Sequence, residues 1–183
     1  MFFRAAWLRC RGLCGTFAVV ALIFGAGLSP SALGQSFPNQ HCYSGSDIIE
    51  IDNEQVVFWK KAEKNQFRAR AHVYGKVSRV FGVRGGDHVH FEIQIGPATR
   101  DVLEVVYNTE FGRIQVAPGM DAQVCGDFIN AFERNGYYSA SPSGAIIHWV
   151  HERRGASTHD EGFVILEDHL FGHGPAKDLD GPI

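Results

Sequence analysis

The sequence predicts a mainly β protein, a small antiparallel barrel with one short helix on its N-terminal side. Three observations lead to this prediction. Apolar residues recur at every second position in five or six short runs between residues 66 and 166. Turns rich in glycine separate these runs. No helical pattern alternates with them, which favours an antiparallel barrel over an α/β fold.

The first 34 residues are typical of a cleaved signal peptide. Arg4, Arg9 and Arg11 precede an uncharged run of 16 residues at positions 13–28, and small residues follow. That run is shorter than the roughly 20 residues that a membrane-spanning helix needs. We therefore expect cleavage before Gln35 and a periplasmic or secreted protein with no membrane anchor. The alternative is a leader that stays uncleaved as an anchor.

Cleavage would leave an acidic chain. The full sequence has 17 Lys and Arg against 20 Asp and Glu, and the leader holds three of the basic residues and none of the acidic ones. The remaining residues include 14 Lys and Arg against 20 Asp and Glu, which gives a net charge of −6. Barrels that bind single-stranded nucleic acid use a cationic groove, so we do not expect nucleic acid as a partner. The candidate basic patch includes Arg68 and Arg70, which share the outward face of a predicted strand.

Two cysteines remain after cleavage. Cys10 and Cys14 belong to the leader, whereas Cys42 and Cys125 lie beyond it. An even pair in an exported protein meets an oxidising compartment, so we expect these two residues to form a disulfide. The alternative is a buried free thiol at Cys125, which lies in a run where apolar residues recur at every second position.

Residues 35–65 form an N-terminal segment with one predicted helix. Positions 35–45 are polar and rich in turn-forming residues, and a helix is expected at 55–64. Asp52 is in place to cap its start, and Lys60, Lys61 and Lys64 lie near its end, where they suit the helix dipole.

The barrel is expected at residues 66–173, where the spacing of apolar residues changes from the helical period to a period of two. The first strand covers about 67–80, and Gly75 within it predicts a bulge or a sharp bend. The connection 130–143 is too polar for a regular element and is predicted to be a long, mobile loop. The tail, 174–183, is predicted to be loose. Further strands are expected at 88–95, 102–108, 119–129, 144–151 and 162–166.

The fifth strand carries the residues of most interest. Strict alternation places Ile147 and Trp149 toward the core, with His148 and Val150 on the other face. His151 would then begin the turn that follows the strand. This arrangement predicts that Trp149 fills part of the barrel interior.

The second half of the chain carries a distinctive set of residues. Its most specific part is IHWVH at positions 147–151, with a further His at 159. With these residues, positions 66–172 resemble a bacterial family of small exported proteins known as domain of unknown function 3465. The resemblance implies an OB-like barrel, the fold of oligonucleotide- and oligosaccharide-binding domains, and carries no known reaction. The chain departs from the family in the loop 130–143 and in Arg153-Arg154. The other residues that carry the resemblance are Gly75-Lys76-Val77, His88, Phe91, Asn108, the segments 119–126 and 144–149, and Gly162.

Histidines and Trp149 form the candidate functional patch. Five of the nine His residues fall in or beside the best-defined strands, and His88 and His90 share one strand face. One alternative is that these His residues are structural or simply face solvent. Another is a site for zinc or another divalent metal built from His148, His151 and His159, which requires a turn near Val150. The candidate ligand-binding residues are His88, Asn108, His148, Trp149, His151 and His159.

The sequence offers little support for an enzyme. It has no GxSxG, HExxH or P-loop motif, and no spacing places two carboxylates together on one strand. No cofactor is indicated apart from the possible metal. We therefore expect an exported binding or structural module of the cell envelope, whose partner is an unidentified envelope ligand or protein. The alternative is a metal-binding protein or metal-dependent hydrolase that uses the C-terminal His residues.

Overall fold

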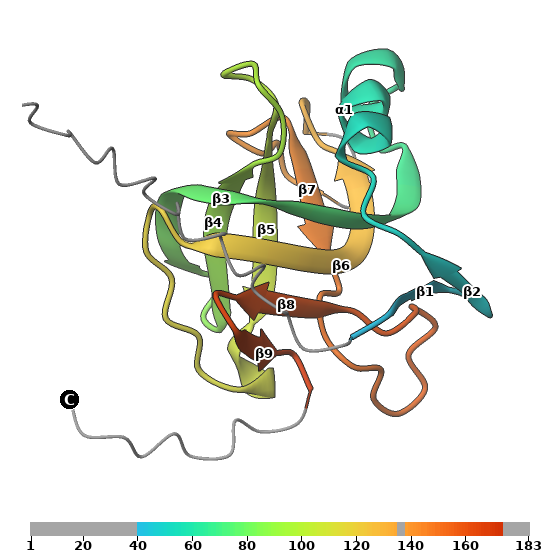
Figure 1. The fold of residues 1–183 in the computed structure, drawn as a ribbon, viewed down its shortest axis with the longest axis vertical. Helices are drawn as coiled ribbons and strands as arrows, with labels where there is room; N and C mark the ends of the chain where they lie inside the picture. The colour runs from blue at the N-terminus through green and yellow to red at the C-terminus, as the bar shows by residue number, and fades with distance from the viewer. Residues whose placement is uncertain (1–39, 135–137, 174–183) are drawn as a thin grey trace, which may run out of the picture. The chain divides into compact units, whose positions relative to one another are not determined.

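The computed structural model describes residues 40–134 and 138–173 and confirms a mainly β fold with one α-helix (Figure 1). The predicted signal peptide and tail lie outside the described residues. No helix within the described ranges is long and apolar enough to cross a membrane. The elements are β1 (Cys42–Ser44), β2 (Asp47–Ile49), α1 (Asn53–Ala62), β3 (Arg68–Arg84), β4 (His88–Gln94), β5 (Val102–Asn108), η1 (Thr109–Phe111), β6 (Asp121–Asn130), β7 (Ala145–His148), β8 (Phe163–Leu166) and β9 (His169–Phe171).

Five strands form a closed ring of hydrogen bonds in the order β3, β4, β5, β7 and β6, and β6 pairs back onto β3. This ring is the predicted OB-like barrel. Strand β7 lies between β5 and β6 and runs parallel to β5, with Val105 opposite Ile147. All other pairings described in the ring are antiparallel. The predicted antiparallel barrel is therefore confirmed. It contains one parallel pair, β5 with β7, which the spacing of apolar residues along each strand cannot predict.

Strand β3 is long because it serves two neighbours. Its first half pairs with β6 and its second half with β4. Gly75 lies where these pairings meet, and a side chain there would collide with the backbone carbonyl of Gln94. The glycine thus permits the close approach of two strands. The register shifts lie further along, between Val77 and Arg79 and between Val80 and Gly82.

Alternate residues of the ring fill the core, and α1 packs against β3 and β6. Val56 of α1 is buried, and the Trp59 ring lies 5.9 Å from that of Phe67 and 5.8 Å from that of Phe128. The predicted cap is confirmed, since the Asp52 side chain accepts a hydrogen bond from the backbone N–H of Gln55 at 2.9 Å. The helix begins two residues before the predicted start.

The N-terminal segment contains a short hairpin, β1–β2, that the sequence analysis did not predict. A disulfide and a histidine are among the contacts that fix it to the barrel. The predicted disulfide between Cys42 and Cys125 is confirmed, with the Cα atoms 5.6 Å apart. His72 on β3 lies 2.9 Å from the Ile49 carbonyl through Nδ1, and its other nitrogen lies 2.8 Å from the Gln123 amide. Burial lowers the pKa of His72, which favours the neutral ring that these two contacts require.

Reduction of the disulfide is expected to destabilise the protein by about 4 kcal/mol, because the bond closes a separation of 83 residues in the unfolded chain. Urea unfolding with and without a thiol reductant measures the difference. The double variant Cys42→Ser/Cys125→Ser is the control, and its unfolding midpoint should not respond to the reductant. Equal midpoints for the oxidised and reduced wild-type protein would contradict the prediction.

Candidate functional site

The site begins where β7 ends. Trp149 has a φ of 51°, a left-handed conformation that non-glycine residues rarely adopt. This turn breaks the alternation of the strand, so that Ile147 and Val150 both enter the core. The prediction that Trp149 fills the core is therefore wrong. Its ring lies outside, partly buried beside Ile146 and Tyr138.

Two glycines make room for this turn. A side chain on Gly126 would collide with the His148 carbonyl oxygen, and one on Gly162 would collide with the Trp149 carbonyl. Strand β6 and the approach to β8 thus pass against the turning backbone at positions where only glycine fits. The location of the Trp149 ring therefore depends on residues 23 and 13 positions away in the sequence.

Five of the six predicted ligand-binding residues are joined by ring contacts, and the sixth, Asn108, caps η1 with its side chain. His88 and Asn108 are direct partners across β4 and β5. The His88 ring is stacked on that of His148 with centroids 6.2 Å apart, and His148 lies edge-on to Trp149 at 4.5 Å. The contacts continue from Trp149 to His159 at 5.9 Å, from His159 to His151 at 5.0 Å, and from His151 to Phe111 at 3.9 Å. We call these seven residues the His–Trp cluster.

Two imidazoles of this cluster, those of His148 and His151, favour the neutral form. Burial, together with the neighbouring His88 and His151, lowers the pKa of His148 to about 4. Burial also lowers the pKa of His151. His151 and His159 direct Nδ1 at the backbone carbonyls of Glu152 and Asp160, at 2.7 and 2.9 Å. Because a carbonyl only accepts, Nδ1 of each ring carries a proton and donates it to the carbonyl.

The geometry gives no support to the three-His metal site. Within residues 40–134 and 138–173, no group of three or more His, Cys, Asp or Glu is arranged to hold a metal ion. His148 and His151 lie on either side of the left-handed turn at Trp149. His90, which shares a face with His88, directs Nδ1 at Glu104 at 2.7 Å.

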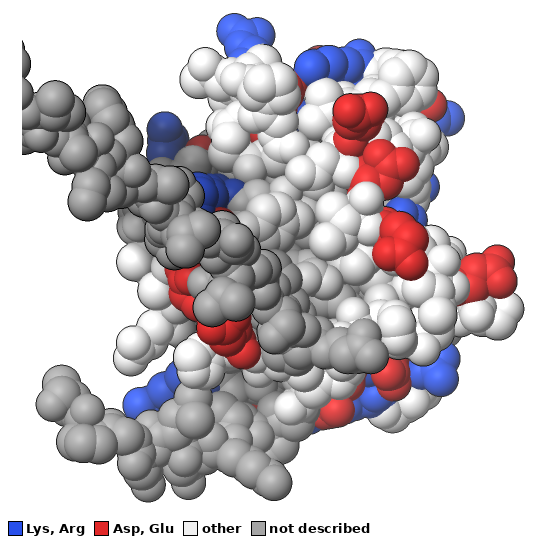
Figure 2. Space-filling model, in the orientation of Figure 1, with Lys and Arg blue, Asp and Glu red and all other residues white. Residues whose placement is uncertain are grey.

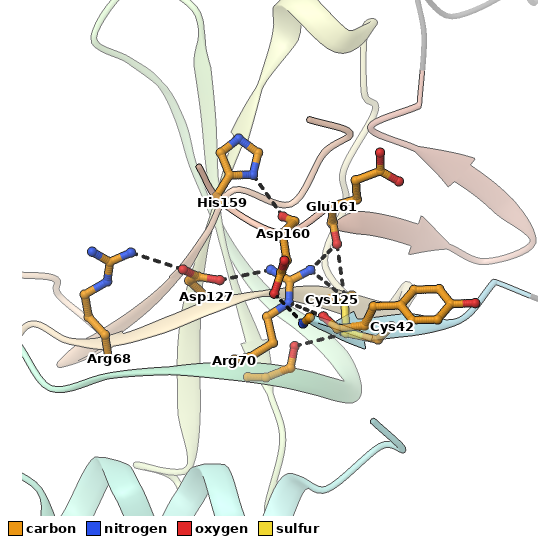
Figure 3. Close-up of polar contacts among 11 residues, drawn as sticks. Cys42, Arg68, Arg70, Cys125, Asp127, His159, Asp160 and Glu161 are labelled. Atoms are coloured by element: carbon orange, nitrogen blue, oxygen red, sulfur yellow. Dashed lines mark hydrogen bonds and ion pairs between the residues drawn. A yellow bond between two sulfur atoms is a disulfide. The ribbon is translucent and has the colours of Figure 1, made fainter. Parts of the chain in front are cut away.

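A groove of about 400 Å³ adjoins the His–Trp cluster. Its walls come from the first residues of β3, from β6, and from Trp149 and the connection to β8. Figure 3 shows several of its side chains in close-up. The Arg68 guanidinium lies over the Trp149 ring, 4.8 Å from its centroid. The lining residues are Arg68, Ala69, Arg70, Asp127, Trp149, Ser157, Thr158, His159 and Asp160.

Asp127 lies between two arginines at the base of this groove. Arg68 donates to one carboxylate oxygen at 3.1 Å and Arg70 to the other at 3.0 Å (Figure 3). The Arg70 side chain is only 6% exposed, and it also donates to the carbonyls of Tyr43 and Glu161. Arg68, in contrast, has half of its side chain exposed. Arg70 therefore holds the structure together, while Arg68 is accessible to a ligand.

Some of these residues escaped the sequence analysis. Arg68 and Arg70 appeared in the candidate basic patch, but Asp127 did not, because its pairing with Arg70 depends on the register of β3 against β6. A second pair, Glu92 and Glu104, also depends on the register between strands. These two residues lie directly opposite each other on β4 and β5.

Glu92 and Glu104 hold the connection between β6 and β7. Glu92 accepts from the Ser143 hydroxyl at 2.6 Å, and Glu104 from the Ser141 hydroxyl at 2.5 Å. Burial raises the pKa of Glu104, but hydrogen bonds from His90 and Ser141 outweigh it and keep the pKa below its ordinary value. This pair therefore has a structural role.

Comparison with protein-family models found no family that matches the chain. Comparisons with curated proteins and with solved structures also found no similar protein. The family resemblance of residues 66–172 stays a prediction.

The folded protein should lose stability as the pH falls from about 6.5 to about 4. His148 has a folded pKa of about 4, below its ordinary value of 6.5, so the unfolded chain binds the proton first. The loss from this residue is roughly 3 kcal/mol at 1.36 kcal/mol per pKa unit. Urea unfolding across this pH range, with NMR titration of the His148 ring, measures it.

The His148→Gln variant should lose this part of the pH dependence. The matched control His169→Gln, at an exposed residue of β9, should keep it. A His148 ring that titrates near pH 6.5 would show that burial does not favour its neutral form.

Proposed function

We propose that this protein is an exported binding module of the cell envelope and that its ligand occupies the groove beside the His–Trp cluster. One observation carries the proposal. The turn at Trp149 takes a large aromatic ring out of the core and places it on the wall of a groove. A strained backbone that persists in a fold often marks a functional site.

The groove suits binding better than catalysis. Both oxygens of Asp127 are engaged by arginines, and Asp160 accepts the backbone N–H of Gly45 at 2.9 Å. These carboxylates are thus held in place by other contacts. A ligand site combines apolar or aromatic surface with a few polar groups that fix the orientation of the ligand, and this groove offers both kinds of group.

Two observations support the assignment to the envelope. The first 34 residues have the pattern of a cleaved signal peptide. The Cys42–Cys125 disulfide is of the kind that persists in oxidising compartments.

Co-sedimentation with isolated cell envelopes tests the proposed function. The wild-type protein should pellet with the envelopes, and Trp149→Ala and Arg68→Ala should reduce the bound fraction at least fivefold. The matched control is Phe58→Ala, which removes an aromatic side chain that is 58% exposed on α1 and should leave binding unchanged.

A second measurement separates lost binding from lost folding. Trp149→Ala should lower the free energy of unfolding less than Ile147→Ala, because Ile147 fills the core and its truncation costs about 2 to 5 kcal/mol. Folded Trp149→Ala protein that pellets as well as the wild type would contradict the proposal. Stoichiometric zinc or another divalent metal in natively purified protein would instead favour the metal-binding alternative.

A further inference from the structure

We propose that the ligand of the groove is an uncharged glycan, a segment of polysaccharide whose sugar rings pack against the planar groups stacked around Trp149. This inference rests on the proposed function, because it names the chemical class of ligand that the same groove takes. Three properties of the groove carry it: its aromatic wall, its balanced charge and its mixture of hydrogen-bond donors and acceptors.

The aromatic wall has a fixed orientation. The Trp149 ring is held edge-on by Tyr138, at 6.2 Å, and by His148, at 4.5 Å. Buried aromatic contacts of this kind restrict a ring to one pose. The Arg68 guanidinium covers one face of this ring at 4.8 Å, and the His159 ring is stacked on it at 5.9 Å. The wall is therefore a set of stacked planar groups and not a bare indole face. One face of a pyranose ring presents mainly C–H groups, and such a face packs well against flat guanidinium and aromatic surfaces.

The charges of the groove cancel. Its formally charged side chains are Arg68 and Arg70 against Asp127 and Asp160. An anionic polymer such as single-stranded nucleic acid requires an excess of cations along its path. On the part of the face that Figure 2 shows in colour, Lys and Arg side chains are interspersed with Asp and Glu. The balance of charge therefore favours a neutral ligand.

The groove also offers both kinds of hydrogen-bonding partner. Arg68 donates, the carboxylates of Asp127 and Asp160 accept, and the hydroxyls of Ser157 and Thr158 do both. A sugar hydroxyl donates and accepts at once, so it can use all of these groups. A phosphodiester or a sulfate ester offers only acceptors at neutral pH, so it could not use the two carboxylates, which also only accept.

The size of the groove agrees with a short stretch of glycan. Its volume of about 400 Å³ falls within the range of roughly 300 to 1,000 Å³ that is typical of small-molecule sites. Half of the Arg68 side chain is exposed, so one wall of the groove borders solvent. A longer polymer can therefore continue beyond the rings that contact Trp149.

Isothermal titration calorimetry with four defined probes tests the inference. The probes are the β-1,4-linked hexamers of glucose and of N-acetylglucosamine, a sulfated heparin hexasaccharide, and single-stranded dT12. At least one neutral hexamer should bind, with an affinity that changes less than twofold between 50 and 300 mM salt. Trp149→Ala and Asp160→Asn should each weaken that binding at least tenfold, whereas Phe58→Ala should not.

The outcomes distinguish this inference from the proposed function. If neither neutral hexamer binds, while Trp149 is still needed for envelope binding, the glycan assignment is wrong and the binding module stands. Binding of dT12 or of the sulfated probe in preference to both neutral hexamers also overturns the glycan assignment. If Trp149→Ala affects neither envelope binding nor any probe, the proposed function itself fails.

Discussion

The arrangement of the site depends on one buried charge. The Arg70 guanidinium is almost fully removed from solvent, and a buried charge is costly unless it is paired and hydrogen-bonded. Asp127 on β6 supplies the opposite charge, and the carbonyls of Tyr43 and Glu161 accept further hydrogen bonds. The same guanidinium lies 3.1 Å from the sulfur of Cys125. One side chain of β3 therefore joins the N-terminal hairpin, β6 and the connection to β8, and it fixes the base of the groove.

The sequence predicts the fold well where its signals are local. The Asp52 cap and the apolar face of β4 require only neighbouring residues, and both agree with the structure, since Phe91 and Ile93 belong to the core. The hairpin β1–β2 and the strand β9 escape prediction because runs of three residues are too short to show a period. The parallel pairing of β5 with β7 escapes because strand order is a property of the closed ring.

The sequence predicts several of the residues that belong to the candidate site but not how they are arranged in space. His88, His148 and His159 were chosen by residue type and by resemblance, and they do meet in space. The position of Trp149 was predicted wrongly, because alternation assumes an extended backbone and a left-handed residue reverses it. Asp127 could not be identified, since its role depends on a register between distant strands.

The long strand β3 also has a consequence for how the chain folds. It closes the ring by pairing Arg68 with Ile129, 61 positions away, and its other half pairs with the adjacent β4. Contacts between such distant residues form slowly, because the intervening chain must first lose much of its entropy. The local β4–β5 hairpin can form early, but the ring closes only when β3 pairs with β6. A chain with this topology is expected to close more slowly than a helical protein of equal length, and an unfolded chain is the form that can be threaded through a narrow channel.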